Sequence, residues 1–220
     1  AQYLKCVNAG VCTSSYYMLL NDLTYANMPV TYVTATESEQ YCEWAGKQLP
    51  TEIEWEKAAR GTDGRIYPWG NEEPANDNAY ANYPGYVDSE TQETGLFEVG
   101  SFPNGVSPYG AMDMAGNVWE WTSSMYQADY YQELVDSAPQ GATTITNPSG
   151  SESGSANVIR GGSAAETEIN NYYAYLRTAN RSYVNMASSY YIGFRCIMPD
   201  PESVSPTQVP TEDAEVTEQP

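Results

Sequence analysis

The first apolar pattern in the chain predicts a short helix that begins near residue 34. Residues 34–37 read Thr-Ala-Thr-Glu, the signature of a capping box, in which side chains bond the free N–H groups of a first helical turn. Tyr41, Trp44 and Ala45 then fall on one helical face. Gly46 follows as a stop signal, so we expect the helix to end there and to present that face to the core.

A second helix is predicted directly after Pro50. Residues 51–54 read Thr-Glu-Ile-Glu, which is another capping box. Trp55, Ala58 and Ala59 form the apolar face, and Gly61 marks the end of the helix.

Beyond residue 61 the pattern changes to short segments interrupted by Gly, Pro, Asn and Asp. Between residues 62 and 157 we expect few regular strands and many long loops, which stay ordered when metal ions or packed aromatic rings hold them. The stretch 141–157, rich in Gly, Ser, Thr and Asn, is expected to be an exposed insertion. Two short strands are expected at 158–162 and 191–196.

The composition divides the chain into a domain, 1–198, and an acidic Pro-rich tail, 199–220. The tail holds five Pro and six acidic residues, with no base and no aromatic residue. It is either a tether or strap that lies over a partner, or a solvated linker.

Charge and the lack of histidine exclude several function classes. The 220-residue chain has a formal net charge of −20 and no His. Ser-His-Asp and Cys-His nucleophile systems and His-based zinc, copper or iron sites are therefore absent. Such an acidic chain is unsuited to nucleic acid or anionic membranes, which require Lys and Arg. Carboxylate and amide oxygens instead suit a hard cation such as Ca²⁺.

The four cysteines, Cys6, Cys12, Cys42 and Cys196, indicate disulfides and an extracytoplasmic location. Of the three pairings we favour Cys6–Cys12 with Cys42–Cys196. In the chain-entropy model, the Cys42–Cys196 disulfide stabilises the folded state by about 4–5 kcal/mol, because it closes a long loop of the unfolded chain. The alternative is four buried thiols in a cytosolic protein.

No apolar run of 18 residues is present, so the sequence predicts no transmembrane helix. The chain starts at Ala1 instead of Met, so whether an export signal or an anchor precedes it is an open question.

Seven sequence blocks, in order, resemble the formylglycine-generating enzyme, or sulfatase-modifying factor, family. They lie at residues 41–61, 67–71, 99–103, 110–121, 160–163, 176–181 and 193–196. The strongest is Gly-Ala-Met-Asp-Met-Ala-Gly-Asn-Val-Trp-Glu-Trp at 110–121. The resemblance implies a loop-rich α+β fold of the C-type-lectin-like kind, and it also implies the pair Cys42–Cys196.

The resemblance further implies a calcium site in the strongest block. Its ligands correspond to the side chains of Asp113 and Glu120 and the carbonyls of Gly116 and Val118. Two carboxylates and two carbonyls make a hard oxygen cage. In the alternative interpretation Asp113 caps a turn and Glu120 pairs with an Arg.

A second calcium site of the family corresponds in part to this chain. Asn82 and the Tyr83 carbonyl match its first two ligands. The downstream acidic ligand has no clean counterpart; Glu93 or Thr94 falls near the position, and Asp88 is a further candidate.

The catalytic members of the family oxidise a substrate cysteine with O₂ and copper(I), held by two Cys five residues apart. The corresponding positions here are Tyr173 and Thr178, and no Cys lies between residues 43 and 195. Neither side chain replaces a soft thiolate ligand. A separate branch of the superfamily makes sulfoxides with His-ligated iron, which a chain without His cannot bind. The sequence therefore predicts a pseudo-enzyme.

The segment near the expected cleft is rich in tyrosine, a residue typical of recognition surfaces. The candidate binding surface consists of Tyr172, Tyr173, Tyr175, Tyr183 and Tyr190, with Tyr191 beside them and Tyr126, Tyr130 and Tyr131 as an extension. The alternative is that about half of them, including Tyr191 and Tyr175, pack in the core.

Three functions remain open from the sequence. The first is a non-catalytic, calcium-stabilised, extracytoplasmic domain that acts as an accessory or interaction subunit with other proteins. The second is a secreted ligand-binding protein of the variable C-type-lectin kind. The third is an oxidase acting on protein cysteine, or another enzyme.

Overall fold

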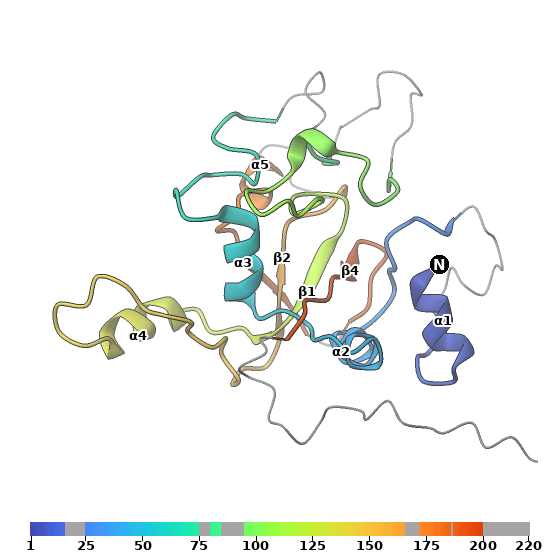
Figure 1. Ribbon diagram of the computed structural model, residues 1–220, viewed down its shortest axis with the longest axis horizontal. Helices are drawn as coiled ribbons and strands as arrows, with labels where there is room; N and C mark the ends of the chain where they lie inside the picture. The colour runs from blue at the N-terminus through green and yellow to red at the C-terminus, as the bar shows by residue number, and fades with distance from the viewer. Residues whose placement is uncertain (16–24, 75–79, 85–94, 166–171, 186, 200–220) are drawn as a thin grey trace, which may run out of the picture.

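The computed structural model describes residues 1–15, 25–74, 80–84, 95–165, 172–185 and 187–199 (Figure 1). The expected tail therefore lies outside the described residues, apart from Pro199. In chain order the elements are α1 (Gln2–Asn8), α2 (Ala35–Trp44), α3 (Glu52–Arg60), a 3-10 turn (Pro103–Gly105), β1 (Trp119–Met125), α4 (Tyr130–Ser137), β2 (Asn157–Arg160), α5 (Tyr172–Tyr175), β3 (Ser182–Val184) and β4 (Ile192–Phe194).

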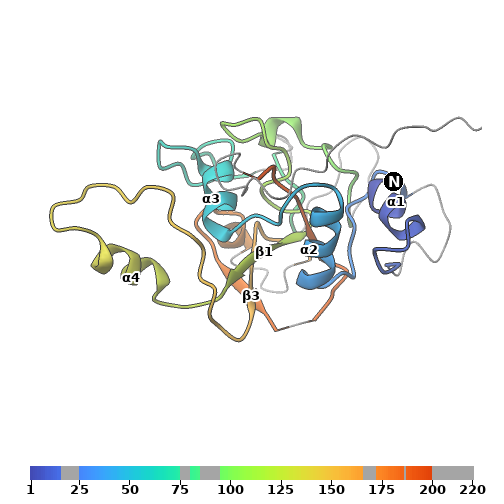
Figure 2. The same cartoon turned by 60° about the horizontal axis from the view of Figure 1, so that its bottom comes forward.

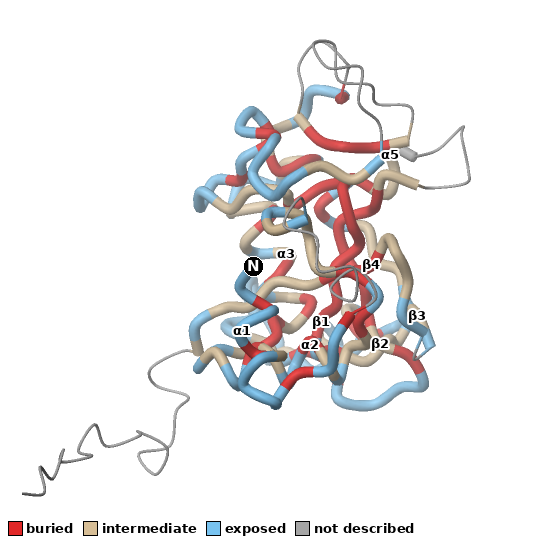
Figure 3. Tube along the Cα trace, turned by 90° about the vertical axis from the view of Figure 1, so that its right-hand side faces the viewer, coloured by how far each residue is buried: buried red, intermediate tan, exposed pale blue. Residues whose placement is uncertain are grey.

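A four-stranded mixed sheet forms the centre of the described chain. Its strand order is β3-β2-β1-β4; β1 pairs antiparallel with β2 and parallel with β4. Figure 3 shows that the buried positions gather along these strands. One core cluster joins the sheet to α2 and is made of Cys42, Leu49, Trp119, Trp121, Ile159 and Ile192.

Both predicted capping boxes are confirmed. The Thr34 hydroxyl accepts a hydrogen bond from the Glu37 amide at the start of α2, and Thr51 does the same for the Glu54 amide at the start of α3. In each case the Glu carboxylate accepts the Thr amide in return, so two otherwise free donors are satisfied.

The apolar face expected for the first helix is confirmed for Tyr41, which packs against two core clusters, and is wrong for Trp44. Trp44 is 39% exposed, and α2 instead buries Ser38 and Cys42. The reason is tertiary: Cys42 is disulfide-bonded to Cys196, which holds that side of the helix against the sheet. For α3 the expected face is confirmed, since Trp55 and Ala59 are buried and Ala58 packs beside them.

The expectation of few strands between 62 and 157 is confirmed among the described residues, where β1 and the first residue of β2 are the strand segments, but the position of β1 was not predicted. Residues 119–122, Trp-Glu-Trp-Thr, alternate apolar and polar types, which is a strand signal, and all four are buried. The strands expected at 158–162 and 191–196 are found as β2 and β4, and β3 was not anticipated.

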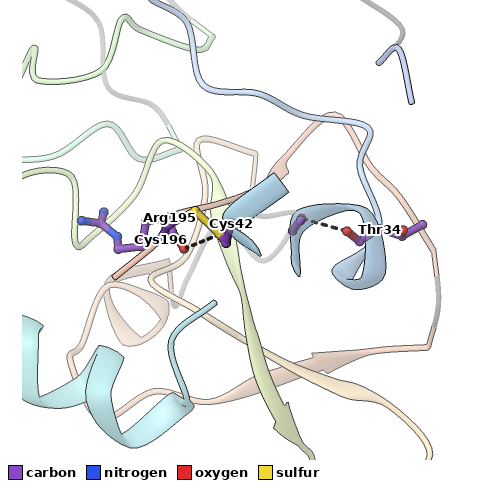
Figure 4. The surroundings of a disulfide bond; sticks show 5 residues. Thr34, Cys42, Arg195 and Cys196 are labelled. Carbon is purple, nitrogen blue, oxygen red and sulfur yellow. Dashed lines mark hydrogen bonds between the residues drawn. A yellow bond between two sulfur atoms is a disulfide. The ribbon is translucent and has the colours of Figure 1, made fainter. Parts of the chain in front are cut away.

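The favoured disulfide pairing is confirmed: Cys6 pairs with Cys12 and Cys42 with Cys196, and no cysteine is free. Figure 4 shows the second bond joining α2 to the chain just after β4, next to Arg195.

Packed aromatic rings hold a long loop, as expected. Trp69 is stacked between Tyr67 and Tyr80, and its ring centroid lies 5.0 Å from that of Tyr67 and 4.9 Å from that of Tyr80.

The segment from α4 to β2 extends away from the sheet in two views (Figures 1 and 2). Positions 141–147 and 152–155 are exposed, which confirms the exposure expected for this segment, although Gly150 and Ser151 are buried at its base.

Among the described residues, no helix has the length and apolar character that crossing a membrane requires.

Candidate functional site

The loop that leads into β1 has an unusual backbone with several positive φ angles. Asp113, Gly116 and Asn117 have φ angles of 56°, 75° and 63°, the left-handed region that ordinary residues rarely adopt. A Cβ on Gly116 would lie 2.0 Å from the carbonyl oxygen of Asn82. The close approach of these two backbones therefore requires glycine at position 116.

The structure brings the two predicted calcium segments together at this point. Asn82 is 1% exposed, and its carbonyl accepts a 2.7 Å hydrogen bond from the Asn117 amide. Its side chain donates to the carbonyl of Gly95 (2.6 Å) and to Oδ1 of Asn117 (3.0 Å). Tyr83 follows in the core, 4% exposed. Glu93, Thr94 and Asp88 lie outside the described residues.

Asp113 and Glu120 have different surroundings. Oδ2 of Asp113 accepts the Gly100 amide at 2.6 Å, whereas its Oδ1 is buried with no hydrogen-bond partner among the described residues. Burial raises the pKa of the Asp113 carboxyl. Glu120 is 5% exposed and forms a bidentate ion pair with Arg195, at 2.5 and 2.6 Å; its Oε2 also accepts Nε1 of Trp55.

The oxygen atoms of this loop are hard donors of the kind that calcium binds, although Glu120 is paired with Arg195, as the alternative interpretation expected. Asp113, Gly116, Val118 and Glu120 all line one cavity of about 530 Å³. A buried carboxylate oxygen without a donor, as at Asp113, is the kind of group that a bound cation satisfies. Oε1 of Glu120 accepts only the Arg195 bond among the described residues, and a carboxylate oxygen accepts more than one. The described part of the chain holds no group of three or more His, Cys, Asp or Glu, so such a site relies on carbonyl oxygens.

The two positions that correspond to the family's copper ligands have structural contacts. Thr178 is 1% exposed, and its hydroxyl lies 3.2 Å from the carbonyl oxygens of Arg65 and Ile66. Tyr173 packs against the core, with its ring edge-on to Tyr83 at 5.9 Å. Both side chains serve packing here, and every cysteine of the chain is in a disulfide.

The candidate tyrosine surface is distributed over several environments. Tyr173 and Tyr175 pack against core clusters, and Tyr190 contacts Tyr32. Tyr183 is 55% exposed and stacks on Tyr126 at 4.2 Å. The side chain of Tyr172 is not described.

Sequence reasoning missed an ionic cluster beneath α3. Glu52, which is fully buried, pairs with Arg181 at 2.6 Å, and Glu56 pairs with the fully buried Arg160 at 2.6 Å. The Tyr131 hydroxyl also donates to Glu56, and burial raises the pKa of that phenol. One signal was available: Glu52 and Glu56 lie four residues apart, and each is three residues before an apolar position of the buried face.

The chain matches the Sulfatase-modifying factor enzyme 1-like domain over residues 2–199. It is 39% identical over 179 residues to the formylglycine-generating enzyme of Thermomonospora curvata, covering 77% of this chain and 55% of that protein. It is 46% identical over 103 residues to the inactive C-alpha-formylglycine-generating enzyme 2 of Bos taurus, covering 46% of this chain and 34% of the relative. The chain thus spans about half the length, or less, of these curated relatives.

Two solved structures have the same fold. PvdO from Pseudomonas aeruginosa superposes with a TM-score of 0.58 at 26% identity, covering 76% of this chain and 60% of that one. Treponema denticola variable protein 1 superposes with a TM-score of 0.55 at 22% identity, covering 76% and 70%. The expected α+β, C-type-lectin-like fold is confirmed.

Proposed function

Because the chain belongs to the sulfatase-modifying factor enzyme 1-like family, we propose that it is a non-catalytic member that acts as an accessory or interaction subunit of a larger assembly. The family contains relatives named as active enzymes and relatives named as inactive. One observation carries the proposal: all four cysteines are in two disulfides, so no thiolate pair is left for copper(I).

A direct test is to supply the substrate and cofactors of the family's oxidation reaction and to look for the aldehyde product. The purified chain is incubated with a cysteine-containing substrate peptide of the T. curvata enzyme, copper(I) and O₂, with that enzyme as the positive control. We expect no aldehyde on the peptide and no copper retained by the chain after desalting. Aldehyde formation above the peptide-only blank would refute the proposal.

The extracytoplasmic location is part of the same proposal. Two disulfides are typical of an oxidising compartment. Pull-down of the protein from its native source, with alkylation of free thiols during lysis, tests location and partners together. Copurification of other subunits with unalkylated cysteines supports the proposal; a free monomer with four alkylated cysteines contradicts it.

Calcium is proposed as the stabilising ion. The orphaned Oδ1 of Asp113 and the neighbouring Glu120 support this choice, and Gly116 and Val118 supply carbonyls from the same loop. Calcium added to the chelator-treated protein is expected to raise the Tm, and equal magnesium to have less effect. Asp113→Asn is a milder change than Asp113→Ala, because an amide oxygen still ligates calcium. An unchanged Tm in calcium would rule the site out.

A second function, a variable ligand-binding protein of the C-type-lectin kind, is favoured by one observation. Tyr183 presents an exposed ring stacked on Tyr126, a geometry typical of recognition residues. The discriminating observation is genomic: a near-identical template repeat beside a reverse transcriptase gene.

A further inference from the structure

A second cavity, separate from the calcium candidate, lies at the outer side of α3. It has a volume of about 330 Å³ and is walled by the second half of α3, the turn that follows it and Tyr131 of α4. Glu56, Lys57 and Arg60 are the charged side chains among its lining residues.

The carboxylates around this cavity are already neutralised. Oε2 of Glu56 accepts Arg160 at 2.6 Å and Tyr131 at 3.2 Å, and its Oε1 accepts Arg60 at 3.0 Å. Asp63, in the turn beyond α3, is bound to the guanidinium of Arg65 at 2.6 Å. Neither carboxylate therefore presents an unbalanced negative charge to the cavity.

The cations are not neutralised to the same degree. Lys57 makes no ion pair within the described part of the chain; its ammonium lies 6.0 Å from the ring centre of Tyr109. Within the described residues, Arg60 bonds through Nη1 alone, and its Nε is buried without an acceptor. The Nε of Arg160, behind Glu56, is buried without an acceptor in the same part of the chain.

The local charge balance is unusual for this molecule. Lys57, Arg60, Arg160 and Arg181 are four of the nine Lys and Arg residues in the chain. They stand against Glu52, Glu54 and Glu56 of α3, an excess of one positive charge in a chain of net charge −20. The guanidinium groups of Arg60 and Arg160 are both bonded through their Nη atoms, but the Nε of Arg60 is a buried donor without an acceptor among the described residues. An anion bound in the cavity provides that acceptor.

We propose that the cavity beside α3 binds a small molecule that carries a carboxylate or phosphate group, with Lys57 and Arg60 contacting the anion. Arg160 contributes its charge from behind Glu56, and Tyr131 closes the side that α4 covers. The volume suits a small metabolite rather than a folded partner. This site is independent of the proposed accessory function, because it shares no residue with the calcium loop or the copper positions.

Titration of the whole chain with succinate and with inorganic phosphate, followed by amide NMR at constant ionic strength, tests the proposal. We expect saturable shifts at residues 57–64 and at Tyr131. The anion that binds more tightly identifies the group that the site prefers. Lack of saturable shifts with both anions up to about 20 mM overturns the proposal, since a built oxyanion site with two cations binds more tightly than that.

Lys57→Gln is the main variant, because this side chain makes no ion pair whose loss would unfold the protein. It is expected to weaken binding at least 5-fold with an unchanged Tm. Lys5→Gln, on α1, is the charge-matched control and should leave the affinity unchanged. Equal weakening by both variants would mean that the anion responds only to net charge, which refutes the site.

Discussion

The carboxylate of Glu52, fully buried at the start of α3, is held in a bidentate ion pair by Arg181, 129 residues later in the chain. The two bonds measure 2.6 and 2.8 Å, and the Arg181 side chain is 14% exposed. The guanidinium also lies 5.0 Å from the ring centres of Tyr126 and Tyr131. This pair therefore connects α3, the segment before β3 and the base of α4.

Arg181→Ala is expected to destabilise the protein by about 3–5 kcal/mol, because it leaves a buried carboxylate without its partner. Urea denaturation measures the change. Arg60→Ala is the control: its ion pair with Glu56 is 38% exposed on the Arg side, and its loss should cost about 1 kcal/mol or less. Glu52→Gln combined with Arg181→Leu should cost less than Arg181→Ala alone. Similar losses for the Arg181 and Arg60 variants would contradict the assignment.

Gly116→Ala is expected to cost about 3 kcal/mol or more, because its Cβ meets the Asn82 carbonyl in addition to the strain of a positive φ. Gly110→Ala is the matched control: its φ is 79°, with no atom within 4 Å of the added Cβ, so only about 1–2 kcal/mol of backbone strain applies. Thermal and urea unfolding of both variants decide the matter. Equal losses would show that the close approach to Asn82 does not contribute.

Tyr3→Phe is expected to stabilise the protein by about 1 kcal/mol. The Tyr3 ring is 2% exposed, and its hydroxyl is buried without a partner in the described part of the chain, so its removal relieves a desolvation cost. Tyr130→Phe is the matched control, since that hydroxyl donates to the carbonyl of Ser149 and its loss should destabilise by about 1 kcal/mol. A destabilised Tyr3→Phe protein would be inconsistent with an unpartnered hydroxyl.

Asp63 is expected to titrate with a pKa of about 2, below its ordinary value of 3.8, chiefly because the Arg65 side chain donates hydrogen bonds to its carboxylate. A lowered pKa in the folded state favours folding at pH values above 3.8. That contribution is lost as the pH falls from 3.8 through about 2. NMR titration of the side-chain carboxyl measures the midpoint.

Arg65→Gln should return the Asp63 pKa toward 3.8, whereas Lys5→Gln, with the same change in net charge, should leave it near 2. A midpoint that stays near 2 in the Arg65 variant would show that the hydrogen bonds are not the cause.

Much of the local structure was predictable because its signals act over three or four residues. The Thr34 and Thr51 capping boxes set the helix starts through contacts within one turn. The calcium segment 113–120 was identified from its resemblance to a family. The lack of His excluded His-based metal sites, and the positions of the four Cys predicted the disulfide pairing, both from the sequence alone.

What only the tertiary structure decided depends on contacts between distant segments. The buried face of α2 is set by the bond from Cys42 to Cys196, 154 residues away. β1 is central because β2 and β4 pair with its two edges, and its first four residues are all buried because other elements, including α2 and α3, pack against it. Glu52 pairs with Arg181, and Asn82 lies against Gly116. The partners in each pair are far apart in the sequence, and hydrophobic periodicity carries no information about contacts at such separations. The sequence alone thus determined the starts of α2 and α3 and excluded His-based metal sites and a copper(I) thiolate pair, whereas packing decided which polar groups share a site.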